Sequence, residues 1–115
     1  MNDHELAAFA AREAGELLLR RRAEGATKDD GDRESNEVIL GILARERPDD
    51  AILSEESKDD KVRLERERVW IVDPLDGTRE FGEAGRSDWA VHVALVVNGT
   101  PTACAVGLPA QDHVV

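Results

Sequence analysis

The sequence predicts an α/β (α+β) chain in which two amphipathic helices precede a group of β-strands. Apolar residues in the N-terminal part recur at the three-to-four-residue spacing of a helix that buries one face. Beyond them come short runs of β-forming residues, the first at 52–53 and the next at 69–72. Two further runs, 89–97 and 102–108, flank Asn98-Gly99, a pair typical of a tight hairpin turn.

The first helix is expected to start beside Asn2, because Glu5 follows it at the spacing of a capping box. Its apolar face would comprise Leu6, Phe9, Ala10, Ala14, Leu17 and Leu18. The basic triplet Arg20-Arg21-Arg22 and Gly25 predict its end, since positive charge suits a helix C-terminus. We interpret the triplet as a solvated helix end, and a patch for a polyanion is the alternative.

A polar loop is expected over 26–32, followed by a second helix from about Glu34 to Arg47 that Pro48 stops. Val38, Ile39, Ile42 and Leu43 would form its buried face. Asp32 would then cap this helix, take part in a site, or do both. The charged segment 58–67 is compatible with a loop or with an exposed helix.

Composition excludes several classes of function. The formal net charge is -10 and the pI is near 4.7, which argues against nucleic-acid binding. No apolar run reaches transmembrane length, and the start MNDHELAAFA lacks the pattern of a signal peptide. We therefore expect a cytoplasmic protein without a membrane partner. The single cysteine, Cys104, allows no internal disulfide and is expected in the core.

The segment VWIVDPLDGTREF, residues 69–81, carries the strongest indication of a functional site. Its apolar run has the pattern of a strand buried on both faces, and Pro74 should end that strand at Asp73. Asp73 and Asp76 flank Leu75, and carboxylate and carbonyl oxygens are the ligands that Mg²⁺ prefers. An ordinary Asp-Gly turn whose acids only cap it is the alternative.

Two neighbouring features favour the site. Gly77-Thr78 is expected to open a short helical turn whose backbone N–H groups favour a phosphate. Upstream, Ile52-Leu53-Ser54-Glu55 is a second apolar run that ends in a carboxylate. Two strand ends that both deliver acids indicate a metal and phosphate site.

LSEES followed by WIVDPLDGTREF resembles the inositol monophosphatase superfamily of Mg²⁺-dependent, lithium-sensitive phosphatases. Arg-Glu-Phe after DPLDGT is similar to its 3′(2′),5′-bisphosphate nucleotidase branch, the CysQ type, which belongs to sulfur metabolism. The resemblance covers nearly the whole chain and implies a layered α/β sandwich. Family members are roughly twice this length, so residues 1–115 are expected to be the N-terminal part of the phosphatase domain, with a possible homodimer.

The resemblance also implies roles for individual residues. Glu55, Asp73 and the carbonyl of Leu75 would hold one Mg²⁺, and Asp73 with Asp76 a second. Asp32 would help to hold a weaker third ion, although Gly31 stands where the family usually has Thr.

The catalytic roles implied are those of Glu55 and Thr78, which would orient the attacking water, with Asp32 assisting. The substrate phosphate would lie against Glu55, Leu75, Asp76 and the N–H groups of Gly77 and Thr78.

The expected reaction is removal of the 3′-phosphate from 3′-phosphoadenosine 5′-phosphate, a small phosphate ester. Hydrolysis of inositol monophosphate or fructose 1,6-bisphosphate is the alternative within the same chemistry. A non-catalytic fragment that binds divalent ions weakly is the alternative of another class, and we expect negligible activity from these 115 residues alone.

Overall fold

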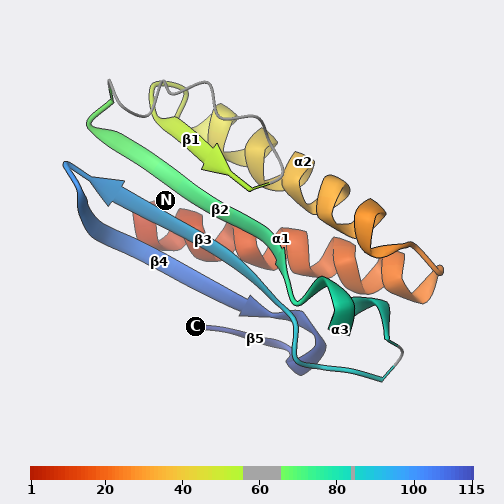
Figure 1. Ribbon diagram of the computed structural model, residues 1–115. Coiled ribbons are helices and arrows are strands. Elements are labelled where there is room, and N and C mark those ends of the chain that lie inside the picture. The colour runs from red at the N-terminus through yellow and green to blue at the C-terminus, as the bar shows by residue number, and fades with distance from the viewer. Residues whose placement is uncertain (56–65, 84) are drawn as a thin grey trace.

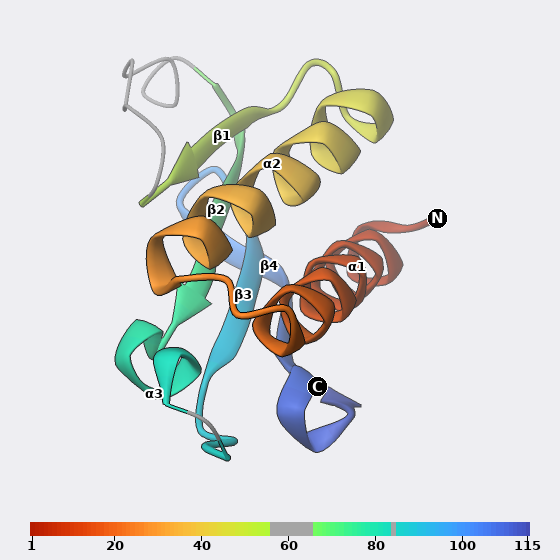
Figure 2. The ribbon, with the colours of Figure 1, turned by 90° about the vertical axis from the view of Figure 1, so that its right-hand side faces the viewer.

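Two long helices cover one face of a mixed β-sheet in the computed structural model, which describes residues 1–55, 66–83 and 85–115 (Figure 1). Helix α1 spans Asp3–Ala23 and helix α2 spans Lys28–Glu46. Figure 2 shows both helices on the same side of the strands. The predicted α/β class is confirmed.

The sheet has five strands in the order β1-β2-β3-β4-β5. The strands are β1 Ala51–Ser54, β2 Arg68–Asp76, β3 Ala90–Val97, β4 Thr100–Leu108 and β5 His113–Val114. Strand β1 pairs in parallel with β2, and every later pair is antiparallel. The short helix α3, Thr78–Gly82, follows β2, and the 3₁₀ turn η2, Pro109–Gln111, joins β4 to β5.

Helix α1 begins as the sequence predicts. The side chain of Asn2 accepts a hydrogen bond from the N–H of Glu5, and Glu5 returns one to Asn2. Its buried face packs on β3 and β4 and consists of Leu6, Ala7, Ala10, Ala11, Ala14, Gly15 and Leu18. The expected face is therefore confirmed, except that Phe9 and Leu17 are only partly buried.

Helix α2 begins six residues before the predicted Glu34, so the expected loop over 26–32 is largely wrong. Thr27 is its N-cap, accepting a hydrogen bond from Asp30 N–H while the Asp30 carboxylate accepts one from Thr27 N–H. This is a capping box in which Asp takes the place of the usual Glu or Gln. Asp32 therefore lies inside the helix, and its alternative role as N-cap is wrong.

Strand β2 differs from its prediction in two ways. Trp70 and Val72 are buried under the helices, whereas Ile71 is 43% exposed, because among the described residues the helices cover only one face. The strand also continues past Pro74 to Asp76, with a shift of register between Asp73 and Asp76. Pro74 is tolerated because it lies within this irregularity, where no ladder hydrogen bond is required of it.

The hairpin at Asn98-Gly99 is confirmed, since both residues adopt positive φ. Cys104 was expected in the core and is exposed, because alternation along β4 turns Ala103 and Ala105 toward the helices. Most of the charged segment 58–67 lies outside the described residues. Within the described part of the chain, no helix has the length and apolar character needed to cross a membrane.

Candidate functional site

The candidate site is built around the irregular end of β2. Asp73 still pairs with His92 of β3, and Asp76 pairs with Ala90, so fewer residues of β3 than of β2 span this interval. Such a bulge bends the strand and turns side chains away from the regular alternation. Leu75, between the two acids, is buried with only 3% of its surface exposed.

Glu55 lies at the same edge of the sheet as Asp73. It follows β1 directly, and its N–H donates to the carbonyl of Val72 at 3.3 Å, one residue before Asp73. Because β1 and β2 are parallel, their carboxyl ends reach this edge together. The side chain of Glu55 is exposed, and its neighbour Glu56 lies outside the described residues.

Three of the predicted acids lie close together, since Glu55 and Asp76 are near enough to Asp73 to affect its pKa. Partial burial raises the pKa of Asp73, and the carboxylates of Glu55 and Asp76 raise it further. His92 and a hydrogen bond from the N–H of Leu75 act in the opposite direction. Asp73 therefore carries its charge at a cost, which a nearby cation would relieve.

Among the described residues, His92 also lies against these acids. Its Nε2 lies 3.1 Å from Oδ2 of Asp76. His92 lies in strand β3. Its contact with Asp76 could not be anticipated, because it depends on the register shift between β2 and β3.

Gly77 and Thr78 form the turn after the acids. Gly77 has φ of 85°, and a Cβ added there would come within 3.0 Å of the carbonyl oxygen of Asp88. Glycine is thus required both by the backbone conformation and by the close approach of the 88–89 segment. Thr78 is the first residue of α3, as the sequence predicts, and Phe81 N–H donates to the Gly77 carbonyl at 2.9 Å.

Asp32 lies in α2 and is partly buried. Gly31 packs against the Phe81 ring so closely that an added Cβ would lie 2.9 Å from it. One helical turn after Asp32, the buried hydroxyl of Ser35 donates to the carbonyl of Pro74 at 2.7 Å. The face of α2 that carries Asp32 is therefore fixed against α3 and the bulge.

Buried polar side chains also hold β1 in place. The Ser54 hydroxyl donates to Oδ1 of Asn36 at 2.5 Å, joining the end of β1 to α2. The sequence prediction missed Ser35, Asn36 and Ser54. A serine and an asparagine next to each other on the apolar side of a predicted helix were the available signal, because buried polar groups need partners.

These acids do not form a finished metal site. Among the described residues, no group of three His, Cys, Asp or Glu side chains is close enough to hold an ion. The donor set nevertheless fits a hard divalent cation, because such ions prefer carboxylate ligands. Asp73 is half-buried, and its pKa is raised by burial and by the carboxylates of Glu55 and Asp76.

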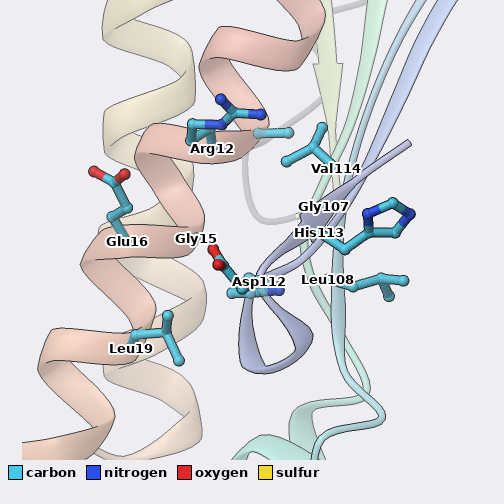
Figure 3. Close-up of a pocket in the computed structure, with 11 residues that line it drawn as sticks. Arg12, Gly15, Glu16, Leu19, Gly107, Leu108, Asp112, His113 and Val114 are labelled. Atoms are coloured by element: carbon cyan, nitrogen blue, oxygen red, sulfur yellow. The ribbon is translucent and has the colours of Figure 1, made fainter.

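A separate cavity of about 440 Å³ lies between α1 and the β4–β5 connection (Figure 3). It shares no lining residue with the predicted site. In the close-up, Glu16 and His113 point away from each other rather than into a common centre. This cavity therefore does not form part of the candidate site.

Comparison with known proteins places this geometry in context. The model of the inositol monophosphatase family matches residues 4–115. The 3′-phosphoadenosine 5′-phosphate phosphatase of Mycobacterium leprae is 52% identical over 98% of this chain and 47% of its own length. The 3′(2′),5′-bisphosphate nucleotidase CysQ of Escherichia coli K12 is 31% identical over 89% of this chain and 46% of its own.

Solved structures agree with the fold. The inositol monophosphatase of Thermotoga maritima superposes with a TM-score of 0.85 at 27% identity, over 99% of this chain and 47% of its own. The chain thus spans about half the length of the relatives it matches.

Proposed function

Because this chain belongs to the inositol monophosphatase family, we propose that the whole protein is a Mg²⁺-dependent phosphatase that removes the 3′-phosphate of 3′-phosphoadenosine 5′-phosphate. The observation that carries the proposal is the half-buried Asp73, whose pKa is raised by burial and by the carboxylates of Glu55 and Asp76. Such an excess of negative charge at a bulge favours a divalent cation.

Asp73 is proposed to contact two ions, one shared with Glu55 and the Leu75 carbonyl and the other with Asp76. Asp32, on the α2 face that Ser35 fixes to Pro74, is proposed for a weaker third ion. When bound, Mg²⁺ would lower the pKa of a water molecule that it binds and would neutralise charge on the phosphoryl oxygens. The number of ions is part of the proposal.

The remaining roles belong to the chain's own groups. Glu55 and the Thr78 hydroxyl orient the attacking water, and Glu55 accepts its proton. The N–H groups of Gly77 and Thr78 donate to phosphate oxygens, and the missing Cβ of Gly77 leaves room for the 88–89 backbone behind the turn. Positioning of water and phosphate by fixed groups is the main contribution a protein makes to phosphoryl transfer.

The choice of substrate rests on similarity. The Mycobacterium leprae relative is named for 3′-phosphoadenosine 5′-phosphate, and it is 52% identical across almost the entire chain. Inositol monophosphate and fructose 1,6-bisphosphate are the competing substrates, and a fragment that only binds metal is the competing role for residues 1–115.

Phosphate release by the whole protein tests the proposal. We expect turnover of 3′-phosphoadenosine 5′-phosphate in Mg²⁺, loss of turnover in EDTA, inhibition by lithium, and a lower kcat/KM for inositol 1-phosphate and fructose 1,6-bisphosphate. A higher kcat/KM for either competitor would overturn the substrate assignment. Full activity in EDTA would overturn the metal assignment.

A further inference from the structure

Arg22, at the end of α1, reaches across to the short helix that follows the candidate site. Its Nε donates to the carbonyl of Phe81 at 2.8 Å, and its Nη2 donates to the carbonyl of Glu80 at 3.1 Å and to that of Glu83. One guanidinium thus donates to three backbone carbonyls, two within α3 and one just beyond it. The carbonyls of Glu80 and Glu83 also accept from the N–H groups of Glu83 and Arg86.

The same guanidinium lies against two buried aromatic rings. Its carbon is 5.8 Å from the ring centroid of Phe81 and 5.4 Å from that of Trp89. Phe81 and Trp89 are each 1% exposed and meet edge to face, with centroids 5.1 Å apart. Cation–π contacts of this kind are strongest where the cation is shielded from water.

The other two arginines of the triplet behave differently. Arg21 pairs with Glu24 and Glu34 at the surface. The Arg20 side chain is exposed and makes no hydrogen bond or ion pair with any described residue. The interpretation of the triplet as a solvated helix end therefore suits Arg20 but is wrong for Arg22.

Arg22 also contacts both sides of the turn that carries Thr78. On one side it holds α3, in which Thr78 is the first residue. On the other it lies over Trp89, whose Cα would be 3.2 Å from a Cβ at Gly77. The turn is thus enclosed between two segments that one side chain connects.

We propose that Arg22 is a positioning residue that acts through Thr78, holding α3 so that the Thr78 hydroxyl keeps its orientation toward the attacking water. The inference rests on the proposed function for its catalytic consequence. Arginine is required because its planar group donates in several directions while it stacks on a ring, whereas the lysine ammonium is a point charge.

A double-mutant cycle in the whole protein tests this role. We expect Arg22→Lys to lower kcat about tenfold with a smaller change in KM, since small misplacements of a catalytic group are costly. In the Thr78→Ala background the same substitution should change kcat much less, because the group on which it acts is gone. Arg20→Gln is the matched control and should leave kcat unchanged.

An equal loss of kcat in both backgrounds would overturn the inference, since Arg22 would then act on the fold in general. Arg22→Gln, whose amide can still reach one carbonyl, is the second variant if Arg22→Lys is too unstable to assay, and the same coupling is expected. Near-UV circular dichroism and Tm establish that each variant is folded.

Hydrogen exchange supplies a readout that does not depend on activity. The amides of residues 79–82 should exchange about tenfold faster in Arg22→Lys than in Arg20→Gln, because local opening of α3 becomes easier. Unchanged exchange would overturn the inference even if the wild type shows no phosphatase activity. A wild type without turnover but with faster exchange in Arg22→Lys would instead refute the proposed function alone.

Discussion

The two ends of strand β2 differ in whether the acidic side chains near them are paired with basic ones. At the start of the strand, Arg68 donates to both Asp3 and Asp50, Arg47 also donates to Asp3, and the Trp70 indole donates to Asp50. At its finish, Asp73 is half-buried near Glu55 and Asp76, with only a histidine opposing them among the described residues.

The difference appears in the pKa values. Hydrogen bonds from Arg68, together with those from Arg47, lower the pKa of Asp3. Burial and neighbouring carboxylates raise the pKa of Asp73. Among the described residues, the acids at the start of β2 are thus paired with arginine, whereas those at its finish exceed the positive charge near them.

The largest effect is expected at the end of β2 that carries Asp73. Asp73→Asn should lower kcat/KM of the whole protein by roughly 10³-fold, because both proposed ions lose a ligand and their charge stabilisation. Without metal, the same substitution should raise Tm, since it removes a carboxylate that the fold disfavours.

Steady-state kinetics measure the loss of kcat/KM in Asp73→Asn, and thermal unfolding in EDTA measures the change in Tm. Calorimetric Mg²⁺ titration tests whether the loss of activity follows from a loss of metal affinity. Glu37→Gln, on the exposed side of α2, is the matched control and should change neither. Equal Mg²⁺ affinity in wild type and Asp73→Asn would remove Asp73 from the site.

The next largest effect is expected at Thr78. Thr78→Ala should lower kcat by about 10²-fold if its hydroxyl orients the attacking water, while KM changes much less. Steady-state kinetics on 3′-phosphoadenosine 5′-phosphate measure the split. An unchanged kcat would exclude Thr78 from the mechanism. Only the acids near the end of β2 would then remain as proposed functional residues.

At the paired end the effect should be on stability instead. Asp50 has only 8% of its side chain exposed and accepts hydrogen bonds from Arg68 and Trp70. Asp50→Ala should cost about 2 kcal/mol of unfolding free energy, because charged and indole donors lose their acceptor. Denaturant unfolding measures this cost. A reduced kcat in the folded variant would contradict the division between the two ends.

The smallest effect is a pH dependence at Asp3. Its pKa is lower folded than unfolded, so the stabilisation is present above about pH 4 and is lost as pH falls through the folded pKa. The Tm difference between wild type and Asp3→Asn should therefore be largest near neutral pH and shrink as the pH falls through the folded pKa of Asp3. A Tm difference that persists at acid pH would mean that Asp3 stabilises the fold through packing or neutral hydrogen bonds rather than through its charge.

The elements whose signals are local were predictable from the sequence. The capping box at Asn2, the hairpin at Asn98-Gly99 and the turn at Gly77-Thr78 each depend on residues close in the chain. The start of α2 was missed because Asp30, rather than the usual Glu or Gln, closes the capping box with Thr27.

The rest depended on tertiary placement. The exposure of Ile71 follows from helices lying on one face of the sheet, which a run of four apolar residues does not reveal. The contact of His92 with Asp76 requires the register shift, and the bonds of Arg22 join residues about sixty positions apart. No local pattern carries such information.

The packing of helix α1 affects how the chain can fold during its synthesis. Its middle packs against the end of β4 and the turn beyond it, where a Cβ on Gly107 would be 3.3 Å from the Ala11 carbonyl and one on Gly15 would be 2.7 Å from Pro109. Helix α1 thus waits for Gly107 and Pro109 to be synthesised before this packing can form, on the order of ten seconds at ordinary rates of synthesis. Until β3 and β4 have been synthesised, α2 can cover only part of the apolar face of α1, so apolar side chains of the nascent chain stay exposed to water.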